Sequence, residues 1–341
     1  TGPVVIGDPV GTPGTVIVTQ TGTIVANGTA QSPIIMTTAA VDNNDDNVAD
    51  DLDGNNFRDP WPGFDPTTCV ANPSAPPAFL CTADATPSFL DDTPTTAPLS
   101  PLAANGSANV ALWGGLVLLG NATTNMANAA GLGQGLGTVE GLTVPGFPVA
   151  DATYGGSVGV GDDADSSGSV SYVSVRHAGD EIGNSNELNG VTLAGVGTGT
   201  EFHHVEVYAN FDDGIEWFGG TVNGHHLQVS QAGDDVFDAD QGYRGTNQFL
   251  VGIMPNFNTA VPANGAYGSA GGDKGCEFDG DDSDVVPTPN VNQNPGSTPA
   301  GQPTPFQNAN FWNLTISGSR PGGASFNGHT NDNDGCEMRN G

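Results

Sequence analysis

A motif that returns after 22 residues constrains the fold of this 341-residue chain more than any other feature. Two adjacent histidines followed by alternating apolar residues occur at 202–207 and again at 224–229. A third copy, shifted by a further 22 residues, places Phe249 at the position of Val205 and Leu227. A fixed period of this length predicts a solenoid, in which each repeat forms one coil and buries its apolar face against its neighbours.

A second short apolar segment, commonly preceded by glycine, accompanies each repeat. These segments lie at 190–193, 214–217, 235–238 (a looser member), 275–278 and 335–338. Two strands per 22 residues, joined by loops of variable length, fit one coil of a parallel β-helix with coils about 4.8 Å apart. No segment keeps a helical period over a dozen residues, and a β-sandwich requires no fixed sequence period. We therefore expect an all-β chain that forms a right-handed parallel β-helix.

The remaining apolar segments fit the same stack, so the sequence predicts a single domain over residues 1–341. These segments lie at 15–18, 23–26, 33–36, 110–119, 170–175 and 311–316. Insertions are expected at about 40–108, which is acidic and Pro-rich, and at about 125–168, 255–272 and 280–308.

Charge narrows the function classes. Six basic residues face 38 acidic ones, which gives a formal net charge of -32. Such a chain repels nucleic acid and anionic membranes and attracts divalent cations. No apolar run is long enough to predict a membrane span. The chain opens at Thr1 without a leader, which we interpret as an exported, extracellular or cell-surface protein whose signal peptide has been cleaved.

Several blocks of sequence resemble a known group of proteins. The blocks lie at 113–122, 187–197, 212–223 and 233–245. They are similar to an uncharacterised family of bacterial secreted or outer-membrane-associated right-handed parallel β-helix proteins. The resemblance covers roughly residues 15–38 and 110–250. It implies export and a β-helix, and it implies no established reaction.

The first acidic cluster has the spacing of a calcium loop. Within residues 42–53, oxygen side chains fall at loop positions 1, 3, 5, 9 and 12, which are Asp42, Asn44, Asp46, Asp50 and Asp53. The pattern resembles the calcium repeats of thrombospondin type 3 and predicts calcium as a cofactor. It departs from an EF-hand loop in having Asn47 at position 6 and Asp rather than Glu at position 12. The alternative is a solvated acidic loop.

The second acidic set repeats with the coils. Asp212 and Asp213 are followed 22 residues later by Asp234 and Asp235, and Glu216 is followed in the same way by Asp238. Stacking brings such carboxylates about 5 Å apart, where each pair repels by about 3 kcal/mol at an effective dielectric of about 20. Calcium bound by the four Asp residues would offset this repulsion. Asp side chains that cap turns through nearby backbone N–H groups are the alternative, and both interpretations stay open.

Histidines and cysteines also repeat. His203 and His225 share an offset with His204 and His226, and period-two alternation predicts one inward and one outward ring in each pair. Only two stacked rings can then converge, which favours a histidine ladder over a transition-metal site.

The four cysteines suggest two disulfides. Cys276 and Cys336 occupy matching coil positions, which predicts a disulfide between them, and Cys69 is expected to pair with Cys81. Two stacked buried thiols at 276 and 336 are the alternative.

These features predict a secreted, acidic, calcium-binding structural or surface protein rather than an enzyme. The terminal strands lack obvious polar caps, which predicts head-to-tail association into oligomers or filaments. The alternatives are a polysaccharide lyase or hydrolase on the β-helix scaffold and an adhesin that binds glycans on the acidic face. A lyase needs a basic residue to accept a proton, and the sequence shows no Lys or Arg cluster.

Overall fold

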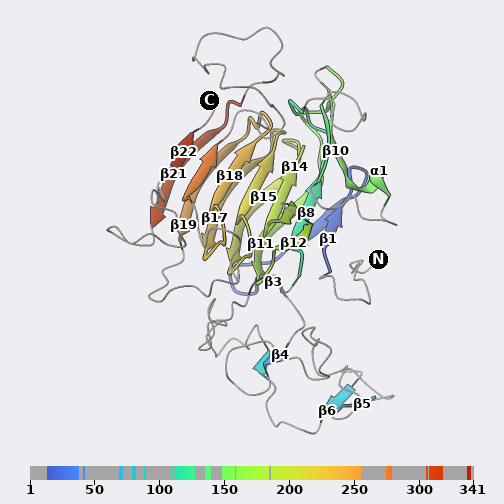
Figure 1. The fold of residues 1–341 in the computed structure, drawn as a ribbon, viewed down its shortest axis with the longest axis vertical. Coiled ribbons are helices and arrows are strands. Elements are labelled where there is room, and N and C mark those ends of the chain that lie inside the picture. The colour runs from blue at the N-terminus through green and yellow to red at the C-terminus, as the bar shows by residue number, and fades with distance from the viewer. Residues whose placement is uncertain are drawn as a thin grey trace.

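The computed structural model describes the greater part of the apolar repeats. It covers residues 14–37, 41–42, 69–71, 79–81, 88–89, 110, 113–126, 135–139, 148–157, 159–183, 186–254, 274–278, 305, 307–317 and 336–338. Two long parallel sheets dominate this part of the chain, and their strands follow one another in stacked coils (Figure 1).

The first sheet contains one short strand from each coil. Its order is β1 (Val16–Val18), β8 (Leu116–Leu119), β14 (Val191–Ala194), β16 (Ile215–Phe218), β18 (Phe237–Asp240), β20 (Cys276–Phe278) and β22 (Cys336–Met338). All neighbouring strands in it are parallel.

The second sheet contains the histidine repeats. Its order is β2 (Ile24–Asn27), β11 (Gly168–Arg176), β15 (Glu201–Tyr208), β17 (Asn223–Ser230), β19 (Thr246–Ile253) and β21 (Asn310–Ser317), and β3 (Ile34–Met36) also pairs with β11. Along the chain, strands alternate between the two sheets. The parallel β-helix predicted from the repeat is confirmed.

Apolar side chains from both sheets meet inside the coils. Trp217 of the first sheet and Val205 and Leu227 of the second belong to one core cluster, and each is almost completely buried. Burying such a side chain contributes about 1.5–3 kcal/mol, so every added coil extends the core and stabilises its neighbours.

The third histidine-type repeat is offset by one residue from the predicted alignment. Leu250, not Phe249, lies beside Leu227, and Phe249 is exposed on the outer face. The cause is a left-handed residue in each long strand of the second sheet, which inserts one outward position and interrupts the alternation. The five left-handed residues are Tyr172, His204, His226, Phe249 and Asn313, with φ of 51°, 51°, 54°, 62° and 55°.

The predicted insertion at 125–168 has its own structure. The antiparallel strands β9 (Leu136–Thr138) and β10 (Thr153–Gly155), with the short helix α1 (Val149–Ala152), lie beside the first sheet. Tyr154 and Val139 pack against Leu119 and Phe218 on the outer face of that sheet. The outer face of these early coils is therefore covered by apolar side chains.

Three antiparallel pairs complete the described strands. They are β12 (Asp180–Gly183) with β13 (Asn186–Leu188), β4 (Val41–Asp42) with β7 (Ser88–Phe89), and β5 (Cys69–Ala71) with β6 (Phe79–Cys81). No helix in the described part of the chain is long and apolar enough to cross a membrane.

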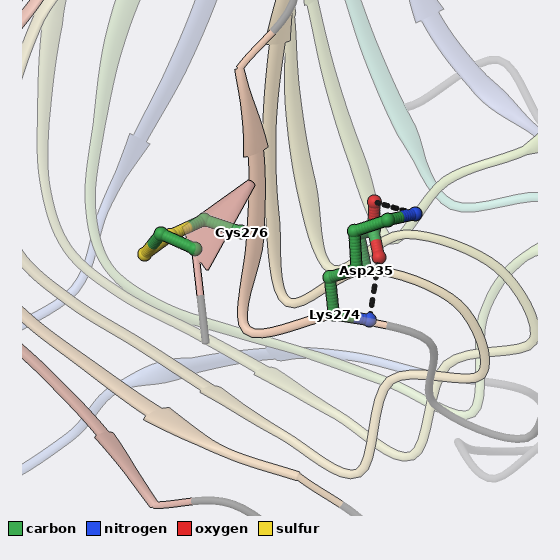
Figure 2. Close-up of a disulfide and its surroundings, with 4 residues drawn as sticks. Asp235, Lys274 and Cys276 are labelled. Carbon is green, nitrogen blue, oxygen red and sulfur yellow. Dashed lines mark hydrogen bonds and ion pairs between the residues drawn. A yellow bond between two sulfur atoms is a disulfide. The ribbon is translucent and has the colours of Figure 1, made fainter. Parts of the chain in front are cut away.

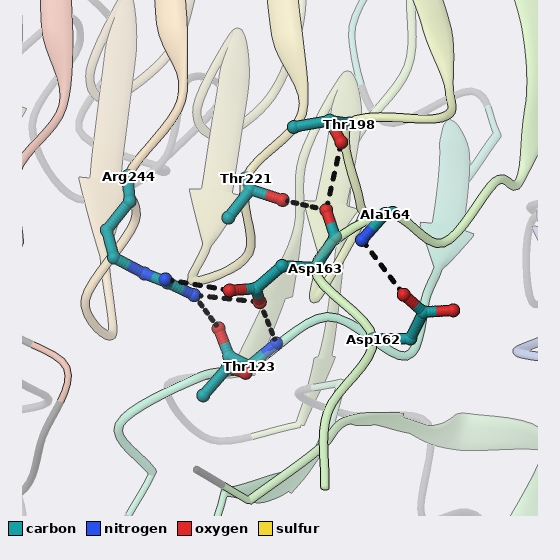
Figure 3. Close-up of polar contacts among 7 residues, drawn as sticks. All are labelled: Thr123, Asp162, Asp163, Ala164, Thr198, Thr221 and Arg244. Atoms are coloured by element: carbon teal, nitrogen blue, oxygen red, sulfur yellow. Dashed lines mark hydrogen bonds and ion pairs between the residues drawn. The ribbon is translucent and has the colours of Figure 1, made fainter. Parts of the chain in front are cut away.

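Asp163 joins turns from successive coils (Figure 3). Its carboxylate accepts two hydrogen bonds from Arg244, at 2.9 and 3.0 Å, and one from the Thr123 backbone N–H at 2.9 Å. Its carbonyl accepts from the hydroxyls of Thr198 and Thr221, at 3.1 and 2.7 Å. Burial raises the pKa of Asp163, but the Arg244 and Thr123 interactions outweigh it and lower the pKa below its usual value.

Candidate functional site

The outer face of the first sheet carries a row of carboxylates. Because side chains alternate along a strand, Ile215 and Trp217 face the core and Glu216 faces outward. The parallel register places Asp238 beside Glu216 and Glu277 beside Asp238. We call Glu216, Asp238 and Glu277 the carboxylate row.

The turns that precede these strands carry a second set of carboxylates. Asp213 accepts a hydrogen bond from the backbone N–H of Asp235 at 2.8 Å. One coil further, Asp235 accepts from the backbone N–H of Lys274 at 2.7 Å. These two Asp side chains therefore cap the turn of the next coil, as the turn-capping interpretation proposed. Each still has a second oxygen that the capping bond does not use.

Two acidic groups are close enough to share a cation. Oxygen atoms of Asp213, Glu216 and Asp238 all lie within 4.8 Å of one another. Asp212, Asp213 and Asp234 form a second group that meets the same limit. Of the four coil Asp residues predicted as metal ligands, the structure thus brings Asp212, Asp213 and Asp234 together. Asp213 belongs to both groups, and carboxylate oxygens are the ligands that calcium prefers.

The electrostatics of this region are unfavourable for ionised carboxylates. Burial raises the pKa of Asp213 well above its usual value, and the charges of Asp212, Asp238, Glu216 and Asp235 raise it further. Burial also raises the pKa of Asp235, with a contribution from Asp234 and an opposing one from Lys274. A bound cation or a bound proton would therefore stabilise the folded chain here.

Lys274, the single lysine of the chain, lies at the end of the carboxylate row. Its Nζ is 2.7 Å from a carboxylate oxygen of Glu277 and 3.9 Å from one of Asp235 (Figure 2). Sequence analysis did not single out Glu277 or Lys274. A signal was available, because glycine, an apolar residue and an acid recur in register at 214–216 and 275–277.

Figure 2 also shows the covalent link in this region, which joins Cys276 to Cys336 with their Cα atoms 4.4 Å apart. The two residues are register partners on β20 and β22, and Glu337 is the register partner of Glu277. On the hairpin of β5 and β6, Cys69 lies opposite Cys81 in the register. A disulfide between Cys69 and Cys81 stays a prediction.

The predicted calcium loop falls mostly outside the described residues. Asp42 lies in β4, opposite Ser88. Asn44, Asp46, Asp50 and Asp53 are outside the part of the chain that the structure describes. Calcium binding by this segment stays a prediction.

The histidines depart from the predicted alternation. Nδ1 of His203 lies 2.8 Å from Nδ1 of His204, and the same distance joins His225 to His226. Both rings of each pair therefore lie on the outer face. The prediction of one inward ring was wrong because the left-handed residues at 204 and 226 interrupt the alternation.

Few basic side chains accompany the carboxylates. The described residues include Arg176, Arg244 and Lys274, and the two arginines form ion pairs with Glu206 and Asp163 at 3.5 and 2.9 Å. Lys274 is therefore the basic side chain closest to the carboxylate row within the described part of the chain. Its ion pairs hold it in the charged form, in which it cannot accept a proton.

Comparison with known proteins agrees with this architecture. A family model described as a pectate-lyase-like β-helix domain matches residues 97–341. Neither a curated protein nor a solved structure matches the chain.

Proposed function

The chain belongs to the pectate-lyase-like β-helix family, and from that premise we propose that it is an exported protein that binds acidic polysaccharide through calcium. The observation that supports this most is the convergence of Asp213, Glu216 and Asp238, whose oxygens lie within 4.8 Å of one another. The family supports a polysaccharide as the ligand class, and the carboxylate chemistry supports calcium as the ion.

Charge explains why a cation is needed. A chain with net charge -32 repels an anionic polymer, and the carboxylate row concentrates that charge on one face. Calcium held by Glu216 and Asp238 would neutralise part of the row and leave coordination positions for the carboxylates of the polymer. Binding is therefore expected only in the presence of the ion.

The test is the retention of the full chain by polygalacturonate, measured with calcium and with a chelator. We expect retention with calcium and its loss in chelator. The variants Glu216→Gln and Asp238→Asn remove ligand charge with little change of shape, and each should weaken retention. Glu206→Gln, on the outer face of the second sheet, is the matched control and should retain binding. Equal retention in chelator would overturn the proposal.

A polysaccharide-cleaving enzyme is the second candidate. One observation favours it: burial raises the pKa of Asp213, while the neighbouring Asp238 is partly exposed. A protonated and an ionised carboxyl side by side can act as the acid and the base of glycoside hydrolysis. Elimination has less support, because Lys274 is ion-paired with Glu277.

Product analysis separates binding from cleavage. New reducing ends would indicate hydrolysis, and a new ultraviolet-absorbing unsaturated sugar would indicate elimination. Binding without either product supports the binding protein. Either product, abolished by Asp213→Asn, would replace it with the enzyme. The head-to-tail association expected from the sequence stays a separate prediction, which light scattering of the full chain can check.

A further inference from the structure

The outer face of the second sheet holds four imidazoles in one cluster. His203 and His204 come from β15, and His225 and His226 come from β17. The first two are partly exposed and the other two are exposed, so the cluster lies at the protein surface. This face is separate from the carboxylate row, which belongs to the first sheet.

The rings are arranged in two stacked columns. His203 and His225 have centroids 4.7 Å apart and an interplanar angle of 7°, and His204 and His226 are 4.5 Å apart with the same angle. Between the columns, the two Nδ1 atoms of each pair are 2.8 Å apart. Ligand nitrogens of His203, His204 and His225 all lie within 4.8 Å of one another.

From this arrangement we propose that the four histidines form a binding site for a divalent transition-metal ion of the zinc, nickel and copper group. Imidazole nitrogen suits these ions, whereas calcium prefers oxygen ligands. Three or four protein ligands define such a site. The two faces of the coil would then bind two chemically different classes of cation.

The proton arrangement supports ligation through Nδ1. Two ring nitrogens 2.8 Å apart cannot both carry a proton, so each pair contains at least one free lone pair. Nε2 of His203 lies 2.9 Å from a carboxylate oxygen of Glu201. Glu201 therefore favours the tautomer with the proton on Nε2, and it directs the Nδ1 lone pair of His203 toward His204.

Glu201 corresponds to the outer partner that metal-bound histidines commonly have. Ligating imidazoles usually donate their second N–H to a carboxylate or a carbonyl, which orients the ring. At the matching position of the next coil, the register places Asn223. We assign Glu201 as a positioning residue that acts through His203.

Distances within each pair suit the ion better than distances between coils. At metal–nitrogen bonds of about 2.0–2.1 Å, adjacent ligand nitrogens are about 2.9–3.4 Å apart. The 2.8 Å separation within each pair is close to this range. The wider spacing between coils requires the rings to tilt toward each other. Since they lie at the surface, they can do so without disturbing the core.

The alternative is a purely structural stack. Tyr172 lies 4.3 Å from His204 at one end, and Phe249 lies 4.8 Å from His226 at the other. These two rings cannot ligate a metal through nitrogen, so stacking alone explains the column that they extend. It does not explain why two adjacent columns contain imidazole in the same two coils. The experiment must therefore keep the stack and remove the nitrogen.

Titration of the full chain with Zn²⁺ by calorimetry, in excess calcium to fill oxygen sites, tests the proposal. We expect one ion per chain. The variants His204→Phe and His225→Phe keep a ring in the stack and should each weaken Zn²⁺ binding at least tenfold. Glu201→Gln should weaken it less, and Tyr172→Phe, in the same column, should leave it unchanged. Far-ultraviolet circular dichroism checks that each variant is folded.

A second probe shows which atoms bind. Co²⁺ in a site of imidazole nitrogens gives visible absorption that a carboxylate site with bound water gives only weakly. We expect this absorption in the parent chain and its loss in the double variant His204→Phe with His225→Phe. Unchanged Zn²⁺ affinity and unchanged Co²⁺ absorption in a folded double variant would overturn the proposal. Absence of Zn²⁺ binding by the parent chain would overturn it as well.

Discussion

The two sheets stack side chains at the same spacing, with opposite energetic consequences. On the second sheet, His204, His226 and Phe249 place neutral rings on one another, and ring stacking is favourable. On the first sheet, Glu216 and Asp238 place like charges on one another, which is unfavourable by about 3 kcal/mol per ionised pair. One backbone repeat thus produces a self-stabilising face and a face that needs a cation, a proton or a covalent link.

The covalent link offers the largest expected effect. The disulfide between Cys276 and Cys336 closes a loop with a sequence separation of 60 residues, on the two strands that also pair Glu277 with Glu337. Replacing both cysteines with serine should lower the free energy of unfolding by about 2–4 kcal/mol.

Urea unfolding in saturating calcium measures this effect. The double variant Cys69→Ser with Cys81→Ser is the control, because a disulfide there would close a much shorter loop. An unchanged midpoint after loss of Cys276 and Cys336 would show that the first sheet needs no covalent link at this end.

The second effect is a pH dependence confined to the first sheet. The pKa of Asp213 is raised in the folded chain, so folding favours its protonated form. In chelator, stability should rise as the pH is lowered from neutral through the raised pKa, and it should fall again when the pH returns. The change should be on the order of 1–3 kcal/mol, since one pKa unit corresponds to about 1.4 kcal/mol.

Asp213→Asn separates charge from capping. The amide oxygen of Asn can still accept the hydrogen bond from Asp235 N–H, but the buried charge is gone. We expect this variant to be more stable than the parent at neutral pH in chelator and to have a flatter pH profile. Thermal melts at several pH values measure both. An identical profile in parent and variant would contradict a charge origin.

The repeat predicted the coil register but not every outward position. Apolar residues such as Val205 and Leu227 are spaced by the core they share, so their pairing follows from the sequence. Phe249 was misplaced because its left-handed conformation depends on the neighbouring coils. Aromatic residues rarely adopt that conformation, and nothing local in the sequence signals it.

The candidate site was predictable to a similar extent. The 22-residue offset identified the stacked Asp residues, because carboxylates at equal coil positions must lie close together. It could not show that Asp213 and Asp235 cap the next turn, since that depends on side-chain rotamers. It also could not bring all four histidines to one face, because the bulge at His204 and His226 reverses the expected direction.

A smaller effect contrasts opposite charges with like charges. Asp163 pairs with Arg244, and these interactions lower its pKa, whereas burial and like charges raise that of Asp213. Asp163→Asn should destabilise the chain by about 1 kcal/mol, because the Asp163 side chain is 44% exposed and solvent screens the pair.

The pH dependence of this pair should have the opposite sign to that of Asp213. A lowered pKa gives stability above the unfolded pKa that is lost as the pH falls through the folded one. For Asp163 this window lies below 3.8, and for Asp213 it lies above that value. Thermal melts of Asp163→Asn should therefore differ from the parent at neutral pH and converge with it in strong acid. A constant difference at every pH would assign the effect to hydrogen bonding alone.

The smallest expected effect tests the stacked rings themselves. His226 lies between His204 and Phe249, with ring centroids 4.5 and 4.8 Å away. His226→Phe keeps a ring at this position and His226→Ala removes it, while both variants have a Cβ at the same left-handed φ of 54°. The backbone cost therefore cancels in the comparison, and the difference reports stacking. We expect the Ala variant to be less stable than the Phe variant by about 0.5–1.5 kcal/mol in metal-free buffer. The difference should not change with calcium, because His226 belongs to the second sheet, whereas the stability of Asp213→Asn relative to the parent should. If calcium altered both differences equally, the two faces would respond as one unit, and the contrast between a self-stabilising sheet and a cation-requiring sheet would fail.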